Sequence, residues 1–146
     1  MRSINRHVSL LFRMGERYVN RKLVGSGVSS GTGILLLELR DGGDRSPSAL
    51  AAAVGVDKSY VTRALQPLQQ AGYVVVTPAP SDRRTVIVAL TDRGKDAASL
   101  MEKAMLSWIA IFSEGVDPAD IDRLEAVFDV FYANAVQYFA ANSKQE

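Results

Sequence analysis

Residues 46–94 have the sequence SPSALAAAVGVDKSYVTRALQPLQQAGYVVVTPAPSDRRTVIVALTDRG, and the spacing within this stretch decides the fold. Ser46-Pro47 is a typical helix start, because a serine N-cap and a proline at the first helical position both suit the unbonded amides there. The short alanine-rich helix that follows is predicted to end at Gly55, and Asp57 is predicted to begin a second helix. Two helices joined by a tight glycine turn indicate a helix-turn-helix.

Beyond Gly72 the period of the sequence changes from helical to extended. Residues 73–77 and 85–90 are rich in β-branched side chains, which favour strands, and the segment between them contains two prolines and two arginines. These segments predict a hairpin with a basic tip. We therefore expect a mainly α fold with a small β-hairpin, which is a winged helix-turn-helix.

Further helices are predicted on both sides of this stretch. They cover residues 4–24, the segment from a cap at Ser29 or Ser30 to the stop at Gly42-Gly43-Asp44, residues 92–113, and the segment that Asp117-Pro118 opens. The first and last are apolar on more than one face, which favours pairing across a two-fold axis, although packing within one chain remains an alternative. We expect residues 1–28 and 114–146 to form a dimerisation region and 29–113 to form the DNA-binding domain. The expected interface residues are Ile4, Val8, Leu11, Val127, Phe128, Phe131, Val136 and Phe139.

Composition excludes several classes of site. The chain has 146 residues, no cysteine and one histidine, so it has no disulfide, no thiolate site and no histidine-cluster metal site. No triad, phosphate loop or metal spacing is present, so we expect neither an enzyme nor a cofactor or metal. No apolar run approaches the roughly 20 residues that span a bilayer, and no secretion signal is recognised, so a cytoplasmic protein without a membrane partner is expected.

Charge is distributed unevenly along the chain. Residues 45–95 carry seven Lys or Arg and three Asp or Glu, whereas residues 96–146 carry three and nine. This asymmetry favours a polyanion-facing middle region, although uneven helix surfaces without a function remain an alternative. The second helix of the motif and the hairpin tip are the expected contacts with double-stranded DNA, because their side chains bond base edges and phosphates. With Ser48 of the first helix, the expected residues are Lys58, Ser59, Tyr60, Thr62, Arg63 and Gln66 of the second helix and Asp82, Arg83 and Arg84 of the tip.

Pro67 lies inside the second helix of the motif. It has no amide hydrogen, and its ring clashes with the carbonyl of Arg63, four residues earlier. The sequence therefore predicts a kink or a local break near Gln66, with base contacts restricted to the first half of the helix.

From residue 46 to residue 95 the chain resembles the winged helix of the MarR (multiple antibiotic resistance regulator) family. The resemblance is carried by SALA at 48–51, VTRAL at 61–65, QAGYV at 70–74, SDRR at 81–84 and LTDRG at 90–94. The flanking helices agree with the family's architecture, whereas Thr77 departs from it, since many members carry an arginine there. The resemblance implies a homodimer that binds a pseudo-palindromic operator, usually as a repressor, and in many members a small ligand weakens DNA binding.

Two questions remain open from the sequence. Phe12, Arg13 and Tyr18 are candidates for a pocket that binds an aromatic or anionic effector, although the same residues also suit core packing and surface charge. A winged helix used for protein–protein assembly, without sequence-specific DNA binding, is the alternative function. The paired arginines at the hairpin tip argue against it, because a protein-binding wing has no need of them.

Overall fold

The computed structural model describes residues 2–80 and 84–142 of the chain. In these ranges helices α1 (Arg2–Lys22), α2 (Ser30–Gly42), α3 (Pro47–Val54) and α4 (Lys58–Gln70) precede strands β1 (Val74–Pro78) and β2 (Val86–Leu90), and helices α5 (Asp92–Phe112) and α6 (Pro118–Asn142) follow. This element order confirms the predicted mainly α fold with one hairpin. The chain divides into two compact units, Met1–Ile109 and Ala110–Glu146. The division into dimerisation and DNA-binding regions stays a prediction.

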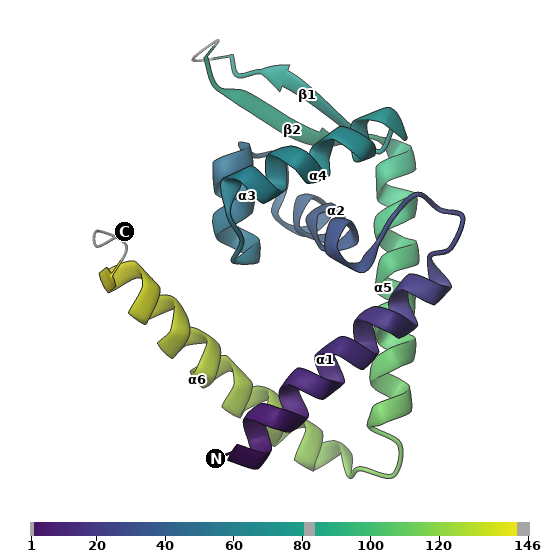
Figure 1. Cartoon of the computed structure of the whole chain (residues 1–146), viewed down its shortest axis with the longest axis vertical. Coiled ribbons are helices and arrows are strands. Elements are labelled where there is room, and N and C mark those ends of the chain that lie inside the picture. The colour runs from purple at the N-terminus through teal and green to yellow at the C-terminus, as the bar shows by residue number, and fades with distance from the viewer. Residues whose placement is uncertain (1, 81–83, 143–146) are drawn as a thin grey trace. The chain divides into compact units, whose positions relative to one another are not determined.

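The helix-turn-helix begins and turns at the predicted residues. Ser46 precedes α3, and its hydroxyl oxygen accepts the amide hydrogen of Ala49 at 3.2 Å. Gly55 ends α3 with a φ of 71°, in the left-handed region that glycine adopts without strain. Asp57 occupies the N-cap position of α4, but its carboxylate makes no capping hydrogen bond. α3 and α4, which this turn connects, pack against each other (Figure 1).

Of the kink or local break predicted near Gln66, the break is wrong, because α4 is one continuous helix from Lys58 to Gln70. The kink stays a prediction. Pro67 begins the last turn and is exposed, and the bond that its missing amide removes is the one to the Arg63 carbonyl, one turn upstream. Its own carbonyl accepts the amide hydrogen of Ala71 at 3.0 Å, and the Tyr73 amide donates to the Leu68 carbonyl at 2.9 Å. Leu68 is fully buried, so packing and these bonds hold the end of the helix in place.

The hairpin of residues 74–90, which we call the wing, is anchored to the helical core at its base. β1 and β2 pair antiparallel with Val74 opposite Leu90, and Val74 and Val88 are buried. On the other edge of β2 the backbone of Arg45 exchanges two hydrogen bonds with Val88, at 3.2 and 2.9 Å. Because a two-stranded hairpin alone is marginally stable, these anchors hold the wing beside α4 (Figure 1).

The junction between the wing and α5 is closed by Thr91 and Gly94. The Thr91 hydroxyl donates to the carbonyl of Gly72 at 2.7 Å and accepts the amide hydrogen of Gly94 at 3.0 Å. The Thr91 amide donates to the carbonyl of Tyr73, also at 3.0 Å. Gly94 is buried against that carbonyl, where a β-carbon would overlap it. One threonine thus caps α5 and ties it to the exit of α4.

A charged network joins α2 to α5. The Arg40 guanidinium donates two hydrogen bonds to the Glu102 carboxylate, at 2.8 and 2.9 Å, and two to the Asp41 carboxylate, at 2.8 and 3.4 Å. Hydrogen bonds from Arg40 hold the pKa of Glu102 and that of Asp41 below their ordinary values. The same bonds, led by that to Glu102, raise the pKa of Arg40. Both carboxylates therefore favour the folded state only while they are ionised.

Acid is expected to weaken this network. Since the folded pKa of Glu102 lies below its ordinary 4.5, its stabilisation is present above that pH and is lost as the pH falls through the lower, folded value. Glu102→Gln should therefore lower the urea midpoint at neutral pH and reduce its further decrease in acid. Glu125→Gln, an exposed change on α6, is the control. An identical pH dependence in Glu102→Gln and the natural chain would contradict the assignment.

Candidate nucleic-acid interface and neighbouring cavity

α4 separates its side chains into two faces. The buried face is apolar and follows three- and four-residue spacing: Val61, Ala64, Leu65 and Leu68. The exposed face follows the same spacing with hydroxyl, guanidinium and amide groups: Ser59, Thr62, Arg63 and Gln66. Packing of the first face in the core therefore presents the second as a continuous polar surface, which is the arrangement that a helix needs to enter a major groove.

The residues that flank this polar face are exposed as well. Ser48 lies in the first turn of α3, and Lys58 begins α4. A hydroxyl and an ammonium group at the starts of helices suit phosphate contacts, which position a protein on DNA. Thr62 donates its hydroxyl hydrogen to the Lys58 carbonyl at 3.0 Å, so its oxygen and its methyl group remain for outside contacts.

Tyr60 does not belong to the exposed face of α4. Its side chain is half-buried and packs against the core, with the hydroxyl beside Gly31 in the first turn of α2. A β-carbon at Gly31 would lie 2.5 Å from that hydroxyl, so the glycine permits the close approach. The structure thus places the Tyr60 side chain between α4 and α2, and not among the four polar residues.

The tip of the wing is described only in part. Asp82 and Arg83, both expected at the DNA, lie outside the described residues, as does Ser81. Arg84 is exposed and lies two residues before β2. The Ala79 amide donates to the Thr85 carbonyl at 2.8 Å, so the backbone pairing of the hairpin continues beyond the ends of β1 and β2. This extension carries Arg84 beyond the paired base of the wing.

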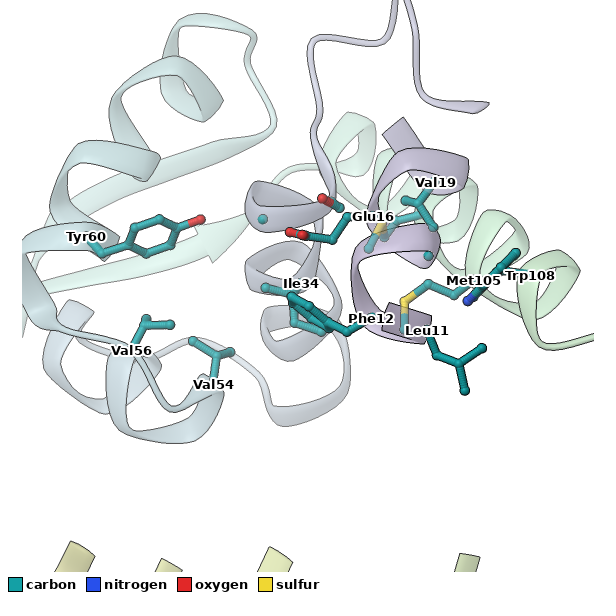
Figure 2. Close-up of a pocket in the computed structure, with 14 residues that line it drawn as sticks. Leu11, Phe12, Glu16, Val19, Ile34, Val54, Val56, Tyr60, Met105 and Trp108 are labelled. Carbon is teal, nitrogen blue, oxygen red and sulfur yellow. The ribbon is translucent and has the colours of Figure 1, made fainter. Parts of the chain in front are cut away.

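A cavity of about 440 Å³ lies within the first unit, beside the helix-turn-helix. Its lining comes from α1, α2, α5 and the segment from the end of α3 into α4. It is mostly apolar and aromatic and includes Phe12, Glu16, Ile34, Tyr60, Met105 and Trp108. Figure 2 shows the Tyr60 hydroxyl and the Glu16 carboxylate pointing into this space from opposite sides. The volume and lining are typical of a small-molecule site.

The structure brings only one of the three predicted pocket residues to this lining, namely Phe12. Arg13 is exposed, and the Tyr18 ring packs against Trp108 with centroids 5.6 Å apart. Sequence reasoning missed Glu16 and Trp108. Glu16 lies on the same helical face as Phe12 and Val19. An acidic residue among apolar residues at that spacing was the sequence pattern that could have indicated a pocket residue. Trp108 gave no such signal, because it comes from a distant helix.

The predicted dimer residues are exposed in the single chain. In α1 these are Ile4, Val8 and Leu11, and in α6 they are Val127, Phe128, Phe131, Val136 and Phe139. Phe139 is 71% exposed, and every residue of α6 with a described side chain except Ile121 is exposed. Exposed apolar side chains in this number are those expected of a dimer interface, and that interface stays a prediction.

In the described part of the chain, no three His, Asp or Glu side chains come close enough to hold a metal ion. None of the helices formed by residues 2–80 and 84–142 is long and apolar enough to cross a membrane.

Comparison with known proteins identifies the same region. A family model described as "MarR family" matches residues 26–85. A putative transcriptional regulatory protein for the hcr operon of Thauera aromatica is 30% identical over 106 residues, which are 73% of this chain and 64% of that protein's length. The chain therefore spans slightly less than two thirds of this relative.

Solved structures share the fold over nearly the whole chain. A MarR transcriptional regulator from Methanosarcina mazei Go1 is 27% identical with a TM-score of 0.87, over 94% of this chain and 99% of that one. A putative MarR family regulator from Listeria monocytogenes, complexed with 26mer DNA, is 16% identical with a TM-score of 0.86, over 97% of this chain and 94% of that one. At 16% identity, the likeness to the Listeria protein shows a shared fold alone.

Proposed function

The chain belongs to the MarR family of winged-helix transcription regulators, and from that premise we propose that it binds double-stranded DNA at a pseudo-palindromic operator as a homodimer. We further propose that it acts as a repressor and that a small ligand releases it from DNA. The observation that carries the proposal is the exposed polar face of α4, formed by Ser59, Thr62, Arg63 and Gln66. The family consists of regulators, and we propose no catalytic role.

Electrostatics and shape support DNA as the partner. The polar face of α4 has a guanidinium and an amide, groups that bond guanine and adenine edges in the major groove. Arg84 precedes β2, where a protruding basic side chain suits the narrow, strongly negative minor groove. The Listeria protein of the same fold was solved with DNA, which supports DNA as the partner. We place its action in the cytoplasm, where such a regulator would meet its DNA.

The exposed apolar side chains of α1 and α6 support the homodimer. A cyclic dimer would cover them and would present two copies of α4 to successive turns of one DNA face. The acidic charge of residues 96–146 suits a region that is held away from phosphates. Operator symmetry then follows from the symmetry of the protein.

Selection of bound duplexes from a random DNA pool tests this proposal. We expect an enriched palindromic motif whose half-sites lie about one helical turn, roughly 10 base pairs, apart. On random duplex DNA the affinity should fall steeply with salt, since Lys and Arg release counterions from phosphates.

The negative outcomes are equally specific. Absence of DNA binding even at low salt would exclude the proposal and favour a winged helix used for protein assembly. A motif without two-fold symmetry would retain DNA binding but contradict the homodimer.

A further inference from the structure

The cavity beside the helix-turn-helix has one ionisable acid in its lining, Glu16, on an otherwise apolar wall. This side chain is half-buried. Its carboxylate makes no ion pair and no hydrogen bond with any residue that the structure describes. Across those same residues the lining contains no Lys, Arg or His that would balance the charge. An unpaired carboxylate at an apolar cavity favours an occupant that brings a positive charge.

The N-terminus of α2 also borders the cavity, through Ser30 and Gly31, and a helix N-terminus attracts anions. Its amides are largely used within the chain. The Ser30 amide donates to Asn20 Oδ1 at 2.7 Å, and the Thr32 amide donates to Ser29 Oγ at 3.2 Å. A helix end is equivalent to about half a positive charge, against the full negative charge of Glu16. The lining therefore favours cations.

Aromatic rings give the same preference. Phe12, Tyr60 and Trp108 come from three different helices and all line the cavity. The faces of such rings attract organic cations, most strongly where water is excluded. Figure 2 shows the rings of Tyr60 and Phe12 on different sides of the Glu16 carboxylate. Ring faces and a carboxylate together are the chemistry that recognises an ammonium group attached to an apolar body.

We propose that this cavity binds a lipophilic organic cation, an aromatic amine or quaternary ammonium compound, with Glu16 as its counter-charge. Arg13, which suggested an anionic effector from sequence, lies outside the lining. The regulatory consequence rests on the proposed function. Tyr60 is part of α4, and its hydroxyl packs against Gly31 of α2, so an occupant that displaces Tyr60 moves the neighbouring DNA-facing residues. DNA must then weaken cation binding by the same factor.

The chain's one tryptophan, Trp108, lines the cavity, so its fluorescence reports occupancy directly. The probes are naphthylmethyl-trimethylammonium and naphthylacetate, which have similar apolar bodies and opposite charges. We expect saturable quenching by the cation and much weaker binding of the anion in the full-length chain without DNA. Glu16→Gln should weaken the cation about tenfold. Glu114→Gln, the same charge change outside the cavity, should leave it unchanged.

The outcomes separate this proposal from the function on which its consequence rests. Equal or tighter binding of naphthylacetate by the natural chain would overturn the cation assignment without requiring any variant to fold. No response to either probe would also overturn it, and would favour a cavity filled by a second copy of the chain. Cation binding that depends on Glu16 would support the site even in a chain that fails to bind DNA. Loss of operator affinity on adding the cation, absent in Glu16→Gln, would support the coupling.

Discussion

Replacing Gly94 with alanine is expected to lower the free energy of unfolding by about 1–3 kcal/mol or more, because the new β-carbon would overlap the carbonyl oxygen of Tyr73. That carbonyl is backbone, and it accepts the amide hydrogen of Thr91, so it cannot rotate away as a flexible side chain would. Relief requires the start of α5 to move from the wing. Without the overlap, alanine would stabilise the helix by about 1 kcal/mol relative to glycine. A net decrease in the free energy of unfolding therefore reports the cost of the overlap.

Urea unfolding followed by circular dichroism measures this change. Asp96→Ala, an exposed substitution two residues along the same helix, is the control and should shift the midpoint little. A Gly94→Ala midpoint equal to that of the natural chain would show that the junction of wing and α5 relaxes without cost.

Arg63→Ala is expected to weaken operator binding by about 1–3 kcal/mol, roughly five- to 150-fold, because a bidentate contact with a guanine edge is worth that amount. Arg63 is exposed on α4, where the structure brings it onto one face with Ser59, Thr62 and Gln66. Titration of the variant against the selected operator and against random duplex measures the loss on each. We expect the larger loss on the operator and a relaxed base preference at one position of each half-site.

Two variants give the comparison for Arg63. Gln70→Ala, at the exposed end of α4, should bind both DNAs like the natural chain. Arg84→Ala, on the wing, should weaken operator binding strongly without unfolding the chain. The reason is that Arg84 is the proposed minor-groove contact, whereas Arg63 is the proposed contact with a base in the major groove. Equal losses on operator and random DNA would make Arg63 a phosphate contact, and an unchanged Arg84→Ala would remove the wing from the interface.

Local sequence patterns predicted the elements and their order. The starts of α3 and α6 follow from Ser46-Pro47 and Asp117-Pro118, since caps and prolines act within a few residues of the chain. The polar face of α4 also follows from sequence, because helical spacing alone separates Arg63 from Val61. These features need no knowledge of distant segments.

Pro67 shows where local reasoning fails. The missing amide and the ring clash are properties of the residue, and they predicted a break. The outcome depended on buried Leu68 and on the Tyr73 amide that closes the helix end. Packing of an adjacent side chain outweighed the local penalty.

The cavity shows the same limit for function. Tyr60 has a polar group on α4, and the sequence pattern predicted a DNA contact for it, whereas its hydroxyl packs on Gly31, nearly thirty residues earlier. Glu16, Tyr60 and Trp108 come from α1, α4 and α5, and no spacing rule relates them.

The sequence by itself thus determined the stretch from Ser46 to Gly94 as a helix-turn-helix with a wing, because capping, helical period and strand period are local properties of the chain. The tertiary structure alone decided that Pro67 leaves α4 unbroken, that Gly94 is held against Tyr73, and that Glu16 faces a cavity that α4 also lines. Each of these depends on contacts between residues far apart in the chain, whose free energy is set by packing.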